Sequence, residues 1–86
     1  MKRVLVSGKV QGVSFRDGAK RKAEELGVVG WVRNLDDGRV EFGIDGENAG
    51  KMIDWISEGP PSAEVRKVEV SEMADPERPI GFEIKE

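Results

Sequence analysis

Residues 8–16 read G-K-V-Q-G-V-S-F-R and connect two segments that differ in hydrophobic periodicity. The preceding residues 2–8, K-R-V-L-V-S-G, hold three consecutive apolar residues and predict a short central β-strand. Residues 15–27 predict an amphipathic helix ended by glycine, with apolar side chains at Ala19, Ala23 and Leu26. A plain strand-to-helix connection needs only about two to six residues, so the long glycine-containing loop raises the question of what it binds.

A β-hairpin is predicted directly after this helix. Residues 28–34, V-V-G-W-V-R-N, predict the second strand, and residues 35–39, L-D-D-G-R, have the composition of a hairpin turn. Residues 40–45 predict a third strand with one buried face, because apolar side chains alternate along it at Val40, Phe42 and Ile44.

A second helix is predicted after the hairpin. It carries an apolar stripe at Ala49, Met52, Ile53 and Ile56. Asp45 or Gly46 is expected to cap its start, and the sequence G-P-P at residues 59–61 is expected to end it.

Two more strands are predicted in the last third of the chain. The alternation in residues 67–71, K-V-E-V-S, predicts the fourth strand, and Val65 breaks its parity, which indicates a bend or bulge near Arg66. A loop is predicted at residues 74–79, A-D-P-E-R-P, and a short terminal strand at residues 81–85, G-F-E-I-K.

The predicted element order is β-α-β-β-α-β with a short C-terminal strand, in a single domain that spans residues 1–86. This order favours the α+β class and a ferredoxin-like α/β sandwich, with an antiparallel sheet and two helices on one face. Because a right-handed crossover makes the first two strands parallel, their C-terminal ends lie at the same edge of the sheet. We therefore expect the loop 8–16 and Asn34 to meet in space.

The composition excludes several kinds of functional site. Among the 86 residues, 37% are hydrophobic and 36% are charged, which is typical of a compact domain with a solvated surface. The chain has no cysteine and no histidine, so it lacks a thiolate nucleophile, the commonest general base and the commonest metal ligand. No membrane-length apolar run or secretory pattern is present, so we expect a cytoplasmic protein without a membrane partner.

Charge is unevenly distributed along the chain. Residues 1–22 carry seven Lys or Arg and one acid, a net of +6, and the remaining residues carry a net of −9. A basic N-terminal quarter can attract a small anion. Nucleic acid is not expected as a partner, because the isoelectric point of about 5.1 is far below that of a nucleic-acid-binding domain.

The loop 8–16 has the features of an anion site. Gly8 and Gly12 permit positive φ, so successive backbone N–H groups can point inward, and the following helix adds its free N–H groups. Arg16 lies at the helix start, where a cation is unfavourably placed for the helix dipole, and its planar fork of donors matches phosphate oxygens. A Walker phosphate loop is excluded because no G-K-[ST] follows at the required spacing.

Two longer stretches resemble the signatures of the acylphosphatase family. V-S-G-K-V-Q-G-V-S-F-R at residues 6–16 looks like the first signature, and G-W-V-R-N-L-D-D-G-R-V-E-F-G-I-D-G at residues 30–46 looks like the second. The element order and the closing G-F-E-I-K are also similar to that family. The resemblance implies a hydrolase that cleaves the carboxyl–phosphate bond of acyl phosphates to a carboxylate and orthophosphate, without metal, cofactor or covalent intermediate.

The resemblance also implies roles for individual residues. Arg16 matches the arginine that grips the phosphoryl group, and Asn34 matches the asparagine whose amide positions the attacking water. The phosphate cradle matches the backbone N–H groups of Val10, Gln11, Gly12, Val13, Ser14, Phe15 and Arg16. Because an acyl phosphate already has a good leaving group, positioning and charge stabilisation can supply the catalysis. Orthophosphate is then expected as product and competitive inhibitor, and a monomer is the expected state.

Other interpretations of these residues stay open at this point. Arg16 could be a surface residue paired with Asp17 or Glu24, Asn34 could merely open the hairpin turn, and the Gln11 side chain could brace the loop. The chain could also be a noncatalytic ferredoxin-like ligand- or RNA-binding module. RNA recognition on such a sheet uses aromatic side chains on the central strands, and these strands offer only Phe42, on the expected core face.

One position departs from the family pattern. After the arginine the family often has bulky or basic residues, whereas this chain continues Asp17-Gly18-Ala19. An acidic side chain suits the first turn of a helix, but its charge beside Arg16 is expected to weaken phosphate affinity.

Overall fold

A computed structural model describes residues 1–74 and 79–85 of the chain. Its elements are β1 (Lys2–Lys9), α1 (Phe15–Leu26), β2 (Val29–Asn34), β3 (Val40–Asp45), α2 (Ala49–Glu58), β4 (Glu64–Glu72) and β5 (Phe82–Lys85). Every predicted helix and strand is present, with bounds that differ by a few residues at most. Of the predicted loop 74–79, residues 75–78 lie outside the described residues.

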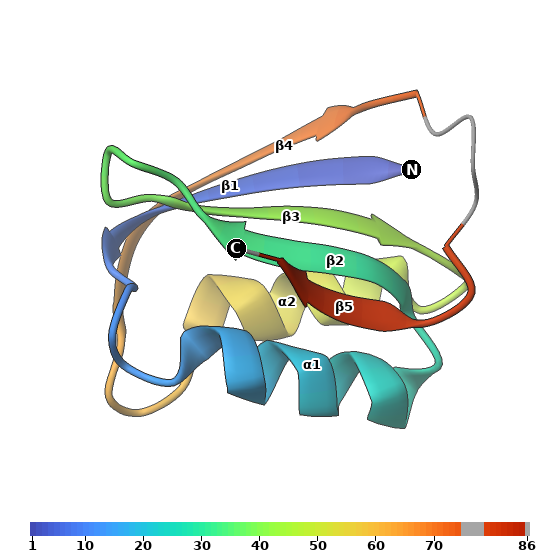
Figure 1. Cartoon of the computed structure of the whole chain (residues 1–86), viewed down its shortest axis with the longest axis horizontal. Helices are drawn as coiled ribbons and strands as arrows, with labels where there is room; N and C mark the ends of the chain where they lie inside the picture. Colours follow the sequence, from blue (N-terminus) through green and yellow to red (C-terminus); the bar gives the residue numbers. More distant parts are fainter. Residues whose placement is uncertain (75–78, 86) are drawn as a thin grey trace.

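The strands form one sheet in the order β4-β1-β3-β2-β5, and both helices cover the same face of it (Figure 1). The first four strands pair antiparallel among themselves, as predicted. β5 instead pairs parallel to β2, so the sheet is mixed and not antiparallel throughout. The ferredoxin-like arrangement is thereby confirmed. Since β1 and β2 both run antiparallel to β3, they run parallel to each other, and the loop after β1 lies at the same end of the molecule as the β2–β3 hairpin (Figure 1).

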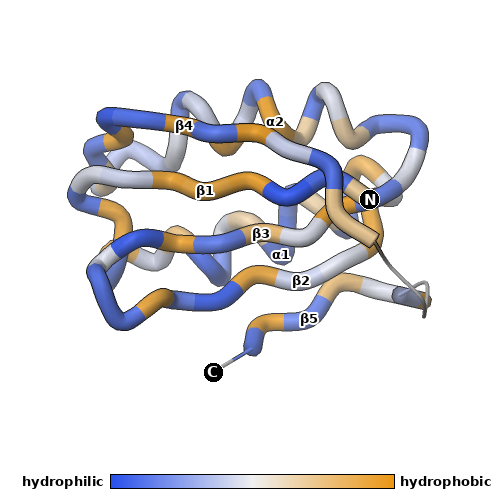
Figure 2. The backbone as a smooth tube through the Cα atoms, turned by 90° about the horizontal axis from the view of Figure 1, so that it is seen from above, coloured by the Kyte–Doolittle hydropathy of each residue, from blue (hydrophilic) through white to orange (hydrophobic). Residues whose placement is uncertain are grey.

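The core lies between the sheet and the two helices. Seen from the sheet side, the middle of β1 is a continuous apolar stretch (Figure 2). The largest fully buried side chains come from both layers and include Phe15, Phe42, Ile44, Met52 and Ile56. Phe15, the first residue of α1, packs against Phe42 at 5.9 Å and Trp55 at 5.7 Å between ring centroids, which fixes the start of this helix against the sheet.

The bulge predicted near Arg66 is confirmed. Between β1 and β4 the register shifts so that Ser7 faces Lys67 but Gly8 faces Val65, leaving Arg66 as the extra residue. Gly8 has φ 128°, and a Cβ atom there would lie 2.1 Å from the carbonyl oxygen of residue 64. Only glycine fits this close approach, which lies one residue before β1 ends at Lys9 and the loop to α1 begins.

The predicted cap of the second helix is wrong. Asn48 is the N-cap residue of α2, and its side chain makes no capping bond. Instead its amide nitrogen donates to the carbonyl oxygen of Leu26 at 2.8 Å, which links the start of α2 to the end of α1. Asp45 accepts a hydrogen bond from the backbone N–H of Gly46 at 2.9 Å, before the helix begins. Sequence spacing could not reveal a partner on the other helix.

The third strand is buried on both faces, not on one. Glu41 points away from the helices, yet only 3% of its surface is exposed. Its carboxylate accepts hydrogen bonds from Arg3 Nε at 2.6 Å and Arg33 Nε at 2.7 Å, from the two flanking strands. Burial by itself raises the pKa of Glu41, but the hydrogen bonds and charges of the two guanidinium groups outweigh it and hold the pKa below its usual range.

From the ion pairs of Glu41 with Arg3 and Arg33 we predict a contribution to stability that is lost in acid. Glu41→Gln should lower the free energy of unfolding by about 1–3 kcal/mol at neutral pH, because two guanidinium groups lose their anionic partner. A lowered folded-state pKa means that the contribution is complete above the ordinary value of 4.5 and is lost as the pH falls through the folded pKa. Urea unfolding of both proteins, at neutral pH and in the acid range, measures the difference.

Glu69→Gln is the matched control for this measurement. Glu69 also pairs with a cation, Lys67 at 2.7 Å, but both side chains are exposed. Its loss should change the free energy of unfolding far less than the loss of Glu41, because water screens an exposed ion pair. A Glu41→Gln effect that is equally large at both pH values would contradict the ionic origin of the stabilisation.

Candidate active site

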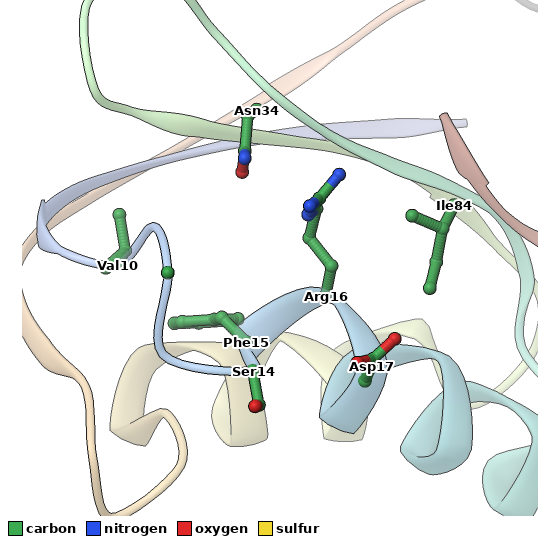
Figure 3. A pocket seen from close by; sticks show the side chains of 8 residues that line it. Val10, Ser14, Phe15, Arg16, Asp17, Asn34 and Ile84 are labelled. Carbon is green, nitrogen blue, oxygen red and sulfur yellow. The ribbon is translucent and has the colours of Figure 1, made fainter. Parts of the chain in front are cut away.

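A cavity of about 270 Å³ opens where the loop after β1, the start of α1, the end of β2 and β5 come together (Figure 3). Its lining residues are Val10, Gly12, Ser14, Phe15, Arg16, Asp17, Asn34 and Ile84. Five of the seven predicted loop residues line the cavity, together with Asn34, so the expected meeting of the loop and the end of β2 is confirmed.

The loop turns sharply before the helix. Gly12 has φ 72°, and Ser14, the N-cap residue of α1, has φ 60° and ψ 24°. A left-handed conformation is unfavourable for serine and typically costs about 1–3 kcal/mol, so the surrounding structure must hold it. Left-handed residues next to a helix start are the pattern that turns neighbouring N–H groups toward one side, where an anion can sit.

Two braces hold this loop in place. The Gln11 side-chain amide donates to the carbonyl oxygens of Leu35 at 2.8 Å and Arg39 at 2.9 Å, at the two ends of the hairpin turn. Ser62 Oγ donates to the carbonyl oxygen of Val13 at 2.9 Å. The Gln11 side chain therefore joins the loop to the hairpin that follows Asn34, and neither Gln11 nor Val13 is among the residues that line the cavity.

Arg16 is the cation of the cavity. Its side chain is half-buried, and Figure 3 shows the guanidinium reaching upward between Asn34 and Ile84. Throughout residues 1–74 and 79–85, no carboxylate forms an ion pair with Arg16, and no group accepts a hydrogen bond from its guanidinium. The alternative that Arg16 is a surface residue paired with Asp17 or Glu24 does not hold in the structure. A half-buried guanidinium with all its donors unused is suited to bind an anion.

Asn34 supplies an amide on the opposite wall. It is paired with Val40 in the sheet register, so its side chain points to the helix-covered face, and Figure 3 shows it directed toward the loop and Arg16. Its Oδ1 atom is buried and has no hydrogen-bond partner within the part of the chain that the structure describes. A buried unpaired oxygen is unfavourable by about 1–3 kcal/mol, so a ligand or water that donates to it is expected.

The hairpin turn is closed without the Asn34 side chain. Leu35 N–H donates to the carbonyl oxygen of Arg39 at 2.8 Å, and Gly38 N–H donates to that of Leu35 at 3.2 Å. Asp37 accepts from the backbone N–H of Arg39 at 3.1 Å. That hydrogen bond lowers the pKa of Asp37, and the Arg39 guanidinium lowers it further. Desolvation raises the pKa, but the net pKa stays below its usual range. The alternative that Asn34 serves to open the turn is not supported by these bonds.

Two lining residues were not predicted as site residues. Ile84 enters the cavity wall because β5 lies parallel to β2, a pairing that no local sequence signal indicates. Asp17 was noted only as a charge beside Arg16, and it lines the cavity with an exposed side chain. Among the described residues no group of three or more His, Cys, Asp or Glu could hold a metal ion, and no helix there is long and apolar enough to cross a membrane.

Comparison with known proteins gives consistent matches. The acylphosphatase family model matches residues 2–84. An acylphosphatase from Rubrobacter xylanophilus is 52% identical over 85 residues, covering 96% of this chain and 77% of the relative. The crystal structure of an acylphosphatase from Bacillus subtilis has a TM-score of 0.90 at 37% identity, covering 99% of this chain and 97% of that one. An acylphosphatase structure from Coxiella burnetii has a TM-score of 0.86 at 45% identity, with coverages of 98% and 90%.

Proposed function

Because this chain belongs to the acylphosphatase family, and is therefore an enzyme for small acyl phosphates, we propose that its cavity carries out their hydrolysis with Arg16 and Asn34 as catalytic residues. One observation carries this assignment of roles. A guanidinium and a buried amide oxygen, both without a partner among the described residues, line the same cavity from two different elements. In a folded protein such groups normally find partners, so a ligand between them accounts for both.

The phosphoryl group is held by Arg16 and the backbone of the preceding loop. The guanidinium donates to two phosphoryl oxygens, and the N–H groups from Val10 to Arg16 donate to the others, aided by the positive end of α1. Gln11 acts through its side chain as a brace, because its amide is engaged with the hairpin carbonyls. Charge that develops on the equatorial oxygens in the transition state is thereby stabilised by donors already in place.

Asn34 positions the nucleophilic water. The water donates one hydrogen bond to Asn34 Oδ1 and attacks phosphorus in line with the bond to the acyl oxygen. That phosphorus–oxygen bond breaks, its electron pair leaves with the carboxylate, and the water proton passes to a phosphoryl oxygen to give orthophosphate. An amide cannot take this proton, so Asn34 contributes alignment and not base catalysis.

This mechanism uses no metal, cofactor or nucleophilic side chain. Orthophosphate binds the same donors as the substrate and should therefore inhibit competitively. We propose a monomer and a cytoplasmic location, as expected from the sequence. An RNA-binding module is not favoured: Phe42 is fully buried on the core face, and the outward positions of β1 and β3 hold Arg3, Leu5, Glu41 and Gly43, without an aromatic residue.

The proposed chemistry is tested by hydrolysis of benzoyl phosphate in the presence of a chelator. We expect undiminished turnover with chelator and competitive inhibition by orthophosphate, because no step of the mechanism needs a metal ion. Release of benzoate and orthophosphate gives the rate directly. Turnover that disappears with chelator and returns on adding a divalent metal would contradict the mechanism.

A further inference from the structure

Asp17 places a second, negative charge on the wall of the anion cavity. It is the third residue of α1, directly after Arg16, and its side chain is exposed. The helix start contains no side-chain cap, so the carboxylate does not serve that role. Within residues 1–74 and 79–85 it receives no hydrogen bond and pairs with no cation. Its charge is therefore available to whatever occupies the cavity beside it.

The position of Asp17 relative to Asn34 determines which part of a substrate meets this charge. In Figure 3, Asn34 reaches into the cavity from one side of Arg16 and Asp17 lies on the other side. In-line displacement puts the attacking water and the leaving oxygen on opposite sides of phosphorus. With the water at Asn34 and the phosphoryl group at Arg16, the acyl group points away from Asn34, toward the part of the wall formed by Asp17 and Ile84.

We propose that Asp17 makes the site selective for acyl phosphates whose acyl group carries a positive charge or none, and against those that carry a further carboxylate. This inference rests on the proposed function and deepens it by naming a substrate class. Two unit charges several ångströms apart near a solvated surface alter binding by about three- to tenfold, and salt screens the effect. The apolar Ile84, which lines the same cavity, offers contact area to the hydrocarbon part of the acyl group without altering this preference.

Three benzoyl phosphates that differ only at the para position test the proposal. One is unsubstituted, one carries a carboxymethyl group and one a trimethylammoniomethyl group, and the methylene spacer insulates the reacting carbonyl from the charge. In the wild-type protein, kcat/KM should be about tenfold higher for the cationic than for the anionic substrate at low salt, and this ratio should shrink at high salt. In Asp17→Asn the ratio should fall to about one, with a lower KM for the anionic substrate.

Glu24→Gln is the matched control, because it removes one exposed negative charge from the same helix, two turns from the cavity. It should leave the cation-to-anion ratio as in the wild type. If Asp17→Asn leaves the ratio unchanged, or if Glu24→Gln lowers it equally, the proposal is overturned. Wild-type hydrolysis of all three substrates without charge preference would overturn this inference alone, whereas failure to hydrolyse even the unsubstituted substrate would overturn the proposed function with it.

Discussion

Arg16→Ala should reduce kcat/KM for benzoyl phosphate by about a thousandfold or more, which is the scale on which single arginines act in phosphoryl transfer. The guanidinium is the one cationic side chain among the lining residues, so nothing else on the described wall replaces its charge. Competitive inhibition by orthophosphate should weaken in parallel, because substrate and product use the same donors. Steady-state kinetics and the orthophosphate inhibition constant measure both effects.

The same substitution should leave the fold intact. Because Arg16 forms no ion pair or hydrogen bond with any described residue, its removal leaves no buried partner unsatisfied, and the melting temperature should stay close to that of the wild type. Arg16→Lys should recover only part of the activity, since an ammonium group cannot make two parallel hydrogen bonds to phosphate.

Arg21→Ala provides the matched control for Arg16→Ala. Arg21 is an exposed arginine of the same helix and does not line the cavity of Arg16 and Asn34. Its loss removes an equal charge and should change kcat/KM by no more than a few-fold through long-range electrostatics. Near-normal turnover in Arg16→Ala, or an equal loss in Arg21→Ala, would refute the role of Arg16.

Asn34→Ala should lower kcat for benzoyl phosphate by about a hundredfold to a thousandfold, with a much smaller change in KM. The substitution removes the acceptor that aligns the water but leaves the phosphate donors in place, so the ground state binds almost as before. Separate determination of kcat and KM distinguishes this result from a general loss of binding.

Stability provides a second readout for Asn34. Since its Oδ1 atom is buried without a partner in residues 1–74 and 79–85, replacing the side chain by a methyl group removes an unfavourable burial, and the melting temperature should not fall. Asn48→Ala is the control: it breaks the 2.8 Å bond to Leu26 and should lower stability by about 0.5–1.5 kcal/mol while leaving kcat unchanged. A destabilised Asn34→Ala with normal kcat would show that Asn34 has a structural role.

Much of the site could be predicted because the handedness of one connection decides it. The first strand, the loop and the first helix are evident from local periodicity, and a right-handed crossover then brings the loop and Asn34 to one end of the sheet. The bulge at Arg66 was also predictable, because a break in alternation is itself a local signal. These features depend on near neighbours in sequence and on general rules of chain topology.

Features that depend on partners distant in sequence were not predicted. In the apolar–polar alternation of β3, Glu41 has the position of a surface residue, but arginines from both neighbouring strands cover it. Asn48 takes its partner on the other helix. That Gln11 could brace the loop was open from the sequence, but its two partners, carbonyl oxygens of the hairpin, were not predicted. The partner of a side chain is set by strand register and helix packing, which sequence spacing does not encode.

The α+β class, the order of the elements and the available chemistry all follow from the amino-acid sequence alone. With neither histidine nor cysteine, that chemistry must come from arginine, carboxylates, amides, hydroxyls or the backbone. In contrast, the packing of the folded chain was needed to see that Arg16 and the Asn34 oxygen lack partners among the described residues, and that Asp17 shares their cavity. The reason is physical: whether a polar group is satisfied depends on every atom packed around it, and those atoms come from segments that meet only when the sheet has formed.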